Sequence, residues 1–283
     1  MIKEKQLCFN NNGKFNIMAV GDIHEKYVPD EKTDDFLRLV NKALDELKPD
    51  LAVLMGDLVS SHFQNEKGER EDLSPAQMRE ELQRTIEPFV SHGIPFAVVF
   101  GNHDGETGLP KETIFSLLQE FPGFLNFSTE GITGIGNCNL LVKSGLDGRD
   151  VFNIWLLDSG NKAPEGRGDD AYVETDQILW YERVSGELAA QNGGKPLPAI
   201  LFQHIPVLEE YELLKKTSRF NPYRVRGNSW NDKHWYVIAD RKNTTGYLGE
   251  GPCTPDYDNG QFESWKKQDD IIGAFFGHDH MND

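Results

Sequence analysis

Apolar runs alternate with helically spaced apolar positions over the first hundred residues. Between the first two runs, apolar residues from Phe36 to Leu47 recur at i, i+3, i+4 and i+7, which predicts an amphipathic helix with Thr33 as its cap. A strand–helix–strand–helix–strand order predicts parallel strands joined by crossover helices. The predicted strands are Phe15–Val20, Leu51–Met55 and Phe96–Phe100, and the second helix is Pro75–Ser91.

The second half of the chain is less regular. It predicts a helix over Asp176–Ala190 and four strands, over Asn139–Val142, Val151–Leu157, Ala199–Phe202 and Ile271–Phe276. Arg219–Gly260 is rich in aromatic residues, Gly, Asn and Arg with weak periodicity, which predicts a long ordered excursion over the functional site. Because no repeat or linker separates these segments, we expect residues 1–283 to form one domain.

Polar clusters follow five of the predicted strands directly. Since functional residues gather at the carboxyl ends of strands in such sheets, we expect these clusters to meet in one site. They are Gly21-Asp22-Ile23-His24, Gly56-Asp57, Gly101-Asn102-His103-Asp104, Gln203-His204 and Gly277-His278-Asp279-His280.

The residue types in these clusters indicate metal binding. Two carboxylates, one amide oxygen and four imidazoles suit Mn, Fe, Zn, Co or Ni better than calcium or magnesium. Seven ligands exceed the needs of one tetrahedral ion but suit two ions that share a carboxylate. Two ions roughly 3.5–4 Å apart can hold a hydroxide between them and bind a substrate phosphate, so the set favours phosphoester hydrolysis. The ligands would be Asp22, His24, Asp57, Asn102, His204, His278 and His280.

The net charge of −17 narrows the choice of partners. Such a field repels polyanions, so nucleic acids and anionic membranes are disfavoured, while a small phosphorylated substrate in a metal-lined cleft is not. Three scattered cysteines favour reduced thiols. The polar N-terminus and the absence of a membrane-length apolar run lead us to expect a cytoplasmic protein.

The ordered motifs GDIH, GDLV, GNHD, QHIP and GHDH resemble those of the calcineurin-like metallophosphoesterase superfamily, from Phe15 to the C-terminus. Within it, Trp155–Gly160, Cys253–Tyr257 and Gly277–Asp283 are similar to the purple-acid-phosphatase-related phosphohydrolases of the DxH type. The resemblance implies a four-layer α/β/β/α sandwich of two mixed β-sheets flanked by helices. It also implies further sheet beyond the last motif, whereas this sequence ends at Asp283.

Roles for individual residues follow from the same resemblance. Asp22, His24 and His280 would bind one metal ion, Asn102, His204 and His278 the other, and Asp57 would bridge them. His103 would stabilise or protonate the leaving oxygen, and Asp104 would orient His103. Ser60 stands where true purple acid phosphatases have a tyrosine ligand, so we expect no purple charge-transfer band.

The predicted activity is metal-dependent hydrolysis of a phosphomonoester. A phosphodiesterase acting on cyclic nucleotides or nucleotide-linked substrates is one alternative, and a non-catalytic binding module on the same fold is another. His62, Arg224 and Arg226 are candidates for substrate binding, although the arginines could equally pair with nearby acids.

Overall fold

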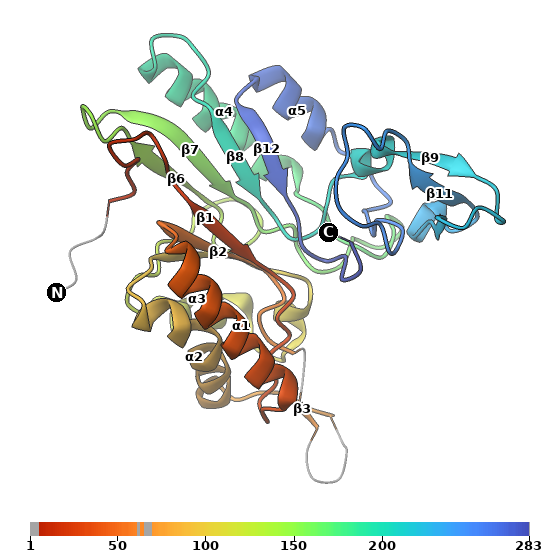
Figure 1. Cartoon of the computed structure of the whole chain (residues 1–283), viewed down its shortest axis with the longest axis horizontal. Coiled ribbons are helices and arrows are strands. Elements are labelled where there is room, and N and C mark those ends of the chain that lie inside the picture. Colours follow the sequence, from red (N-terminus) through yellow and green to blue (C-terminus); the bar gives the residue numbers. More distant parts are fainter. Residues whose placement is uncertain (1–5, 61–62, 65–69, 283) are drawn as a thin grey trace.

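Two β-sheets stack face to face in the computed structural model, which describes residues 6–60, 63–64 and 70–282 (Figure 1). The first sheet has the order β1-β2-β5, with all neighbours parallel. The second has the order β12-β8-β7-β6, in which only β6 runs antiparallel to its neighbour. The strands are β1 (Ile17–Val20), β2 (Leu51–Met55), β5 (Phe96–Val99), β6 (Cys138–Lys143), β7 (Asp150–Leu156), β8 (Ala199–Phe202) and β12 (Ile271–Phe275).

Helices cover the outer face of each sheet (Figure 1). The first sheet carries α1 (Glu31–Leu47), α2 (Pro75–Ser91) and α3 (Lys111–Leu118), and the second carries α4 (Thr175–Gln191) and α5 (Gln261–Gln268). The predicted α/β/β/α sandwich is therefore confirmed, with the difference that only the second sheet is mixed among the described strands. No helix in the described part of the chain has the length and apolar character that a membrane span needs.

The apolar residues of strand β2 pack into two different layers of the core. Leu51 and Val53 belong to the buried cluster between the two sheets, whereas Ala52 and Leu54 belong to the cluster beneath the helices. Because successive side chains of a strand point to opposite faces, a strand buried on both sides needs an uninterrupted apolar sequence. A third cluster, which includes Trp155 and Trp180, lies between the second sheet and its helices.

Helix α1 begins earlier than its apolar spacing predicts. Its N-cap is Asp30, whose side chain accepts a hydrogen bond from Lys32 N, and Thr33 is the third helical residue. The Thr33 hydroxyl accepts from the backbone N–H of Asp30, so the two side chains form a capping box. The prediction that Thr33 is the cap was wrong because an acidic cap residue precedes it.

Two strands of the excursion, β10 (Val225–Arg226) and β11 (Trp235–Ile238), form a small antiparallel sheet with β9 (Leu214–Thr217), which directly precedes the excursion. Figure 1 shows this sheet beside the second main sheet. The later part of the excursion pairs with the loop after β12 through a bridge between Leu248 and Asn282. The remaining elements are the strand pair β3 (Phe63–Gln64) and β4 (Arg70–Glu71) and three 3-10 turns, η1 (His103–Glu106), η2 (Leu208–Leu213) and η3 (Ser229–Asn231).

A buried acid in α2 makes the stability of the fold depend on pH. Burial raises the pKa of Glu81 to about 8 from its ordinary 4.5, although the charge of Arg84 opposes the shift. The unfolded chain loses this proton near pH 4.5 while the folded chain keeps it, so the stabilisation is complete at low pH and is lost as pH rises to about 8.

We therefore expect Glu81→Gln to increase the free energy of unfolding at pH 8, with a benefit that shrinks toward zero near pH 4.5. The slope of the difference should not exceed about 1.4 kcal/mol per pH unit. Urea denaturation at several pH values measures it, with exposed Glu80→Gln on the same helix as the control. A difference that does not change with pH would contradict this interpretation.

Candidate metal centre

The loops after β1, β2, β5, β8 and β12 meet at one edge of the sandwich. Within each sheet, the strands that carry these loops run parallel to one another. The polar clusters that follow them therefore lie at the same end of the sheet. One hydrogen bond joins the loops after β12 and β8 of the second sheet, and another joins the loop after β12 to the first sheet. Gly277 N donates to His204 O at 3.1 Å, and His278 N donates to Asp22 Oδ1 at 3.1 Å.

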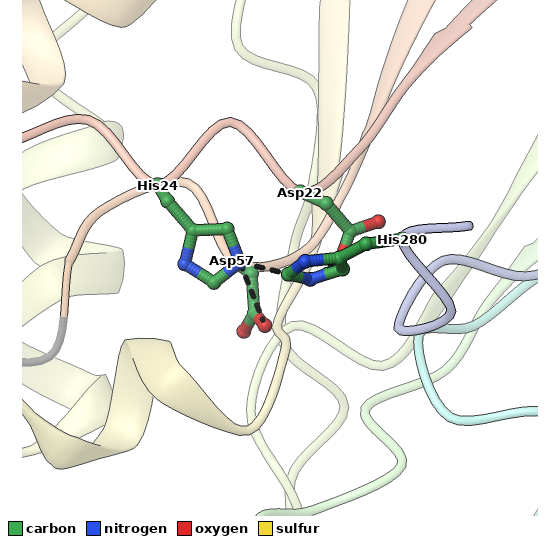
Figure 2. Close-up of side chains that lie close together, drawn as sticks. All are labelled: Asp22, His24, Asp57 and His280. Atoms are coloured by element: carbon green, nitrogen blue, oxygen red, sulfur yellow. Dashed lines mark hydrogen bonds and ion pairs between the residues drawn. The ribbon is translucent and has the colours of Figure 1, made fainter. Parts of the chain in front are cut away.

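Four of the predicted ligands form one compact group, shown in Figure 2. Asp22, His24, Asp57 and His280 each offer one ligand atom, and these atoms all lie within 4.8 Å of one another. The Nε2 atoms of His24 and His280 are 3.1 Å apart. His280 Nε2 lies 3.4 Å from Asp22 Oδ1, and His24 Nε2 lies 3.6 Å from Asp57 Oδ2.

Asp57 also contacts a second group. His204 Nε2 lies 3.3 Å from Asp57 Oδ2 and 3.1 Å from Asn102 Oδ1. The His278 ring packs 5.2 Å from the His204 ring, measured between centroids. The structure thus brings together all seven residues that the sequence singled out, with Asp57 between the two groups.

An unpaired buried atom in this region fits a metal site. Asp57 Oδ2 is buried and has no hydrogen-bond partner of good geometry in the described part of the chain. A buried polar atom without a partner is destabilising by about 1–3 kcal/mol, and more when it is charged. Because carboxylate, amide and imidazole donors converge here, the residues present fit divalent transition-metal ions.

The backbone at the ligand positions is strained. Asp22, His24, Asp57 and His278 have φ angles of 52°, 48°, 48° and 76°. Such left-handed conformations are unfavourable for residues with a side chain, cost on the order of 1–3 kcal/mol each, and concentrate at functional sites. All four residues lie in the loops that meet at the shared edge.

Two glycines allow the loops to approach one another. A methyl group at Gly56, whose φ is 90°, would lie 2.6 Å from both Gly101 N and His204 Nδ1. A methyl group at Gly101 would lie 2.2 Å from Asp57 Oδ1. Glycine therefore precedes Asp57 and Asn102 because these turns pack backbone against backbone.

The electrostatics of Asp57 and His24 favour the protonation states that bind metals, whereas nearby carboxylates raise the pKa of His204 and of His278 although burial lowers both. Burial alone would raise the pKa of Asp57, but the adjacent His204 imidazole holds this pKa at about 2. Burial lowers the pKa of His24, and the neighbouring His280 and His103 lower it further against the attraction of Asp57. An ionised carboxylate and a neutral imidazole are the forms that coordinate a cation.

Asp104 contacts backbone groups and not the His103 ring. Its buried carboxylate accepts hydrogen bonds from Asp57 N at 2.9 Å, Leu58 N at 2.9 Å and Gly101 N at 2.8 Å. The ion-pair partner of His103 is Glu106, with Nδ1 and Oε2 3.0 Å apart. The expectation that Asp104 orients His103 was therefore wrong, because the turns after β2 and β5 direct their N–H groups at this carboxylate.

The structure does not test the three candidate substrate-binding residues. His62 lies outside the described residues. Arg224 donates to Asn221 O and stacks on Trp235, and Arg226 donates to Asp232 O. These contacts lie within the excursion, so binding of phosphate by the two arginines stays a prediction.

Sequence reasoning gave no role at the metal site to three of its neighbours. Glu106 could have been found, because it lies one turn after His103 at a spacing that suits a side-chain pair. Asp170 and Cys253 lie close to His278, yet they come from separate loops and belong to none of the metal-ligand motifs.

The fold and the site geometry can now be compared with known proteins. The family model of the calcineurin-like phosphoesterases matches residues 15–282. The chain belongs to the calcineurin-like phosphoesterase family. This match confirms the resemblance based on the five motifs, and it covers the same part of the chain as they do.

Relatives of this family member include plant and yeast proteins. The "Probable inactive purple acid phosphatase 14" of Arabidopsis thaliana is 26% identical over 99% of this chain and 69% of its own length. The yeast "Phosphatase DCR2" of Saccharomyces cerevisiae is 24% identical over 99% of this chain and 46% of its own length. Among solved structures, a dimetal phosphatase from Danio rerio has a TM-score of 0.46 and 12% identity, covering 75% of this chain and 72% of that one.

The network around Asp104 yields a stability prediction. Asp104→Ala leaves three backbone N–H groups without their acceptor, so we expect it to lower the free energy of unfolding by about 3 kcal/mol or more. Glu106→Ala on the same turn is the control and should lower it by about 1 kcal/mol or less. Urea denaturation of the metal-free proteins measures both. Equal stability of the two variants would show that Asp104 does not hold the turns.

Proposed function

We propose that this protein is a metal-dependent phosphoester hydrolase that acts on phosphomonoesters. The observation that carries the proposal is the position of Asp57, whose Oδ2 faces His24 in one ligand group and His204 in the other. Asp22, His24 and His280 would hold one ion with Asp57, and Asn102, His204 and His278 would hold the other. When bound, a pair of such ions acidifies a water molecule and offsets the charge of the phosphoester.

His103 is the residue we assign to the leaving oxygen. Its ring lies 5.2 Å from the His24 ring between centroids, and 39% of its side chain is exposed. Glu106 pairs with Nδ1, so among the described residues Nε2 has no hydrogen-bond partner and can donate to a substrate oxygen. A positioned imidazole of this kind can stabilise the departing alkoxide and protonate it.

We assign the alcohol portion of the ester to a polar cavity lined in part by Glu106, the partner of His103. It has a volume of about 630 Å³, and its lining includes Glu106, Asn161 and Lys162. Lys162 Nζ lies 3.6 Å from Glu106 Oε1, so the cavity shares a side chain with the His103 pair. Its size is typical of small-molecule sites, which favours a small phosphorylated metabolite over a macromolecule.

Metal content and substrate preference test the proposal together. We expect elemental analysis of the purified protein to find two divalent transition-metal ions per chain. The protein loaded with the metal found should hydrolyse p-nitrophenyl phosphate faster than bis(p-nitrophenyl) phosphate. Comparable rates on the two would favour a phosphodiesterase. Inactivity on both with two ions bound would favour a non-catalytic binding module.

Two substitutions separate metal binding from the later chemistry. His103→Ala should retain both ions and lower kcat by roughly 10²–10⁴-fold, because the residue acts on the leaving oxygen and not on a metal. Asp57→Asn should reduce the binding of both ions, since its carboxylate faces both ligand groups. Metal titration and steady-state kinetics on the same samples measure these effects. Loss of an ion from His103→Ala would overturn the assignment of that residue.

A further inference from the structure

Asp170, Cys253 and His278 form a second cluster of potential metal ligands next to the predicted site. One oxygen, one sulfur and one nitrogen from these residues lie within 4.8 Å of one another. Asp170 precedes α4, Cys253 lies in the last part of the excursion, and His278 follows β12. Asp170 and Cys253 match no metal-ligand motif, yet both converge on a residue assigned to the second ion.

The contacts within this cluster use both oxygens of Asp170. Cys253 Sγ donates to Asp170 Oδ2 at 3.3 Å. Asp170 Oδ1 faces His278 Nε2 at 3.6 Å. Only 18% of the Asp170 side chain and 12% of the His278 side chain are exposed, so these groups interact with little screening by solvent.

Neighbouring backbone contacts fix the position of the cluster. Asp170 pairs with Lys162 in an isolated β-bridge, and Cys253 N donates to Asp279 Oδ1 at 3.0 Å. The second contact attaches the excursion to the loop that carries His278. The carboxylate and the thiol are therefore held beside the imidazole by the fold.

An imidazole that presents one nitrogen to a carboxylate has only the other for a metal ion. His278 directs Nε2 at Asp170, and its ring packs beside His204 in the second ligand group. A carboxylate behind a metal-bound histidine fixes the tautomer and the direction of the ring, and its removal typically weakens metal binding 10–100-fold.

We propose that Asp170 is a positioning residue for the second metal ion. Its carboxylate faces His278 Nε2 and so directs His278 Nδ1 toward the ion, while the Cys253 thiol holds the carboxylate in place. The inference rests on the proposed two-ion centre and adds to it a carboxylate and a thiol that touch no ion themselves.

Titration of the metal-free protein with Co²⁺ tests this proposal. Calorimetry and the absorption spectrum monitor the titration. In Asp170→Ala we expect the dissociation constant of one Co²⁺ equivalent to rise 10–100-fold while the other is unchanged. Asp170→Asn keeps an acceptor oxygen and should recover part of the affinity. Exposed Asp169→Ala, one residue away, is the matched control and should bind both equivalents like the unmodified protein.

Cys253→Ser distinguishes a supporting thiol from a ligand. The serine hydroxyl can still donate to Asp170, so we expect nearly unchanged affinity and no sulfur-to-cobalt charge-transfer band in either protein. A strong near-ultraviolet band that disappears in Cys253→Ser would place a cation on the sulfur and overturn the proposal. Unchanged affinity in Asp170→Ala, or equal weakening of both equivalents, would also overturn it. Failure of the unmodified protein to bind cobalt would instead contradict the metal centre itself.

Discussion

The buried carboxylate of Asp57 is the group around which the site is arranged. It is 1% exposed, its Oδ1 accepts from His103 N, and its Oδ2 faces His24 and His204 without a hydrogen bond of good geometry. A carboxylate this buried needs compensating positive charge or hydrogen-bond donors. The histidines supply part of this compensation, and two bound cations would supply the remainder. A two-ion centre would therefore explain both the burial of the Asp57 carboxylate and the proposed function.

The rest of the fold supports that arrangement. Both sheets end their parallel strands at one edge, which brings Asp22 and Asp57 from the first sheet to His204 and His278 from the second. The buried carboxylate of Asp104 ties together the turns after β2 and β5. Hydrogen bonding at Asp104 and dense packing at Gly56 offset the backbone strain at the ligand positions, which explains how four left-handed residues persist there.

The sequence predicted the helices and strands whose apolar residues have a clear periodicity and whose ends are marked by turn or capping residues. Leu51–Met55 and Pro75–Ser91 were predicted with their observed bounds, because turn residues end the apolar run and Ser74 caps the helix. Helices α3 and α5 were missed because each has only eight residues. The small sheet of the excursion was missed because its strands are short and partly exposed.

The convergence of the candidate metal ligands could be predicted from the sequence. The contacts that Asp104 and Asp170 make around these ligands could not. The clusters after the strands indicated a common edge, and the family resemblance implied which residues would share a group. The contacts of Asp104 depend on backbone N–H directions in two turns, and those of Asp170 depend on how two loops pack. Neither can be inferred from residue type or spacing.

Anomalous X-ray diffraction from crystals grown with Mn²⁺ or Zn²⁺ tests the central claim most directly. The account predicts two anomalous peaks, one on each side of Asp57, with the first among Asp22, His24 and His280 and the second among Asn102, His204 and His278. A single peak, or peaks that do not share Asp57, would contradict it.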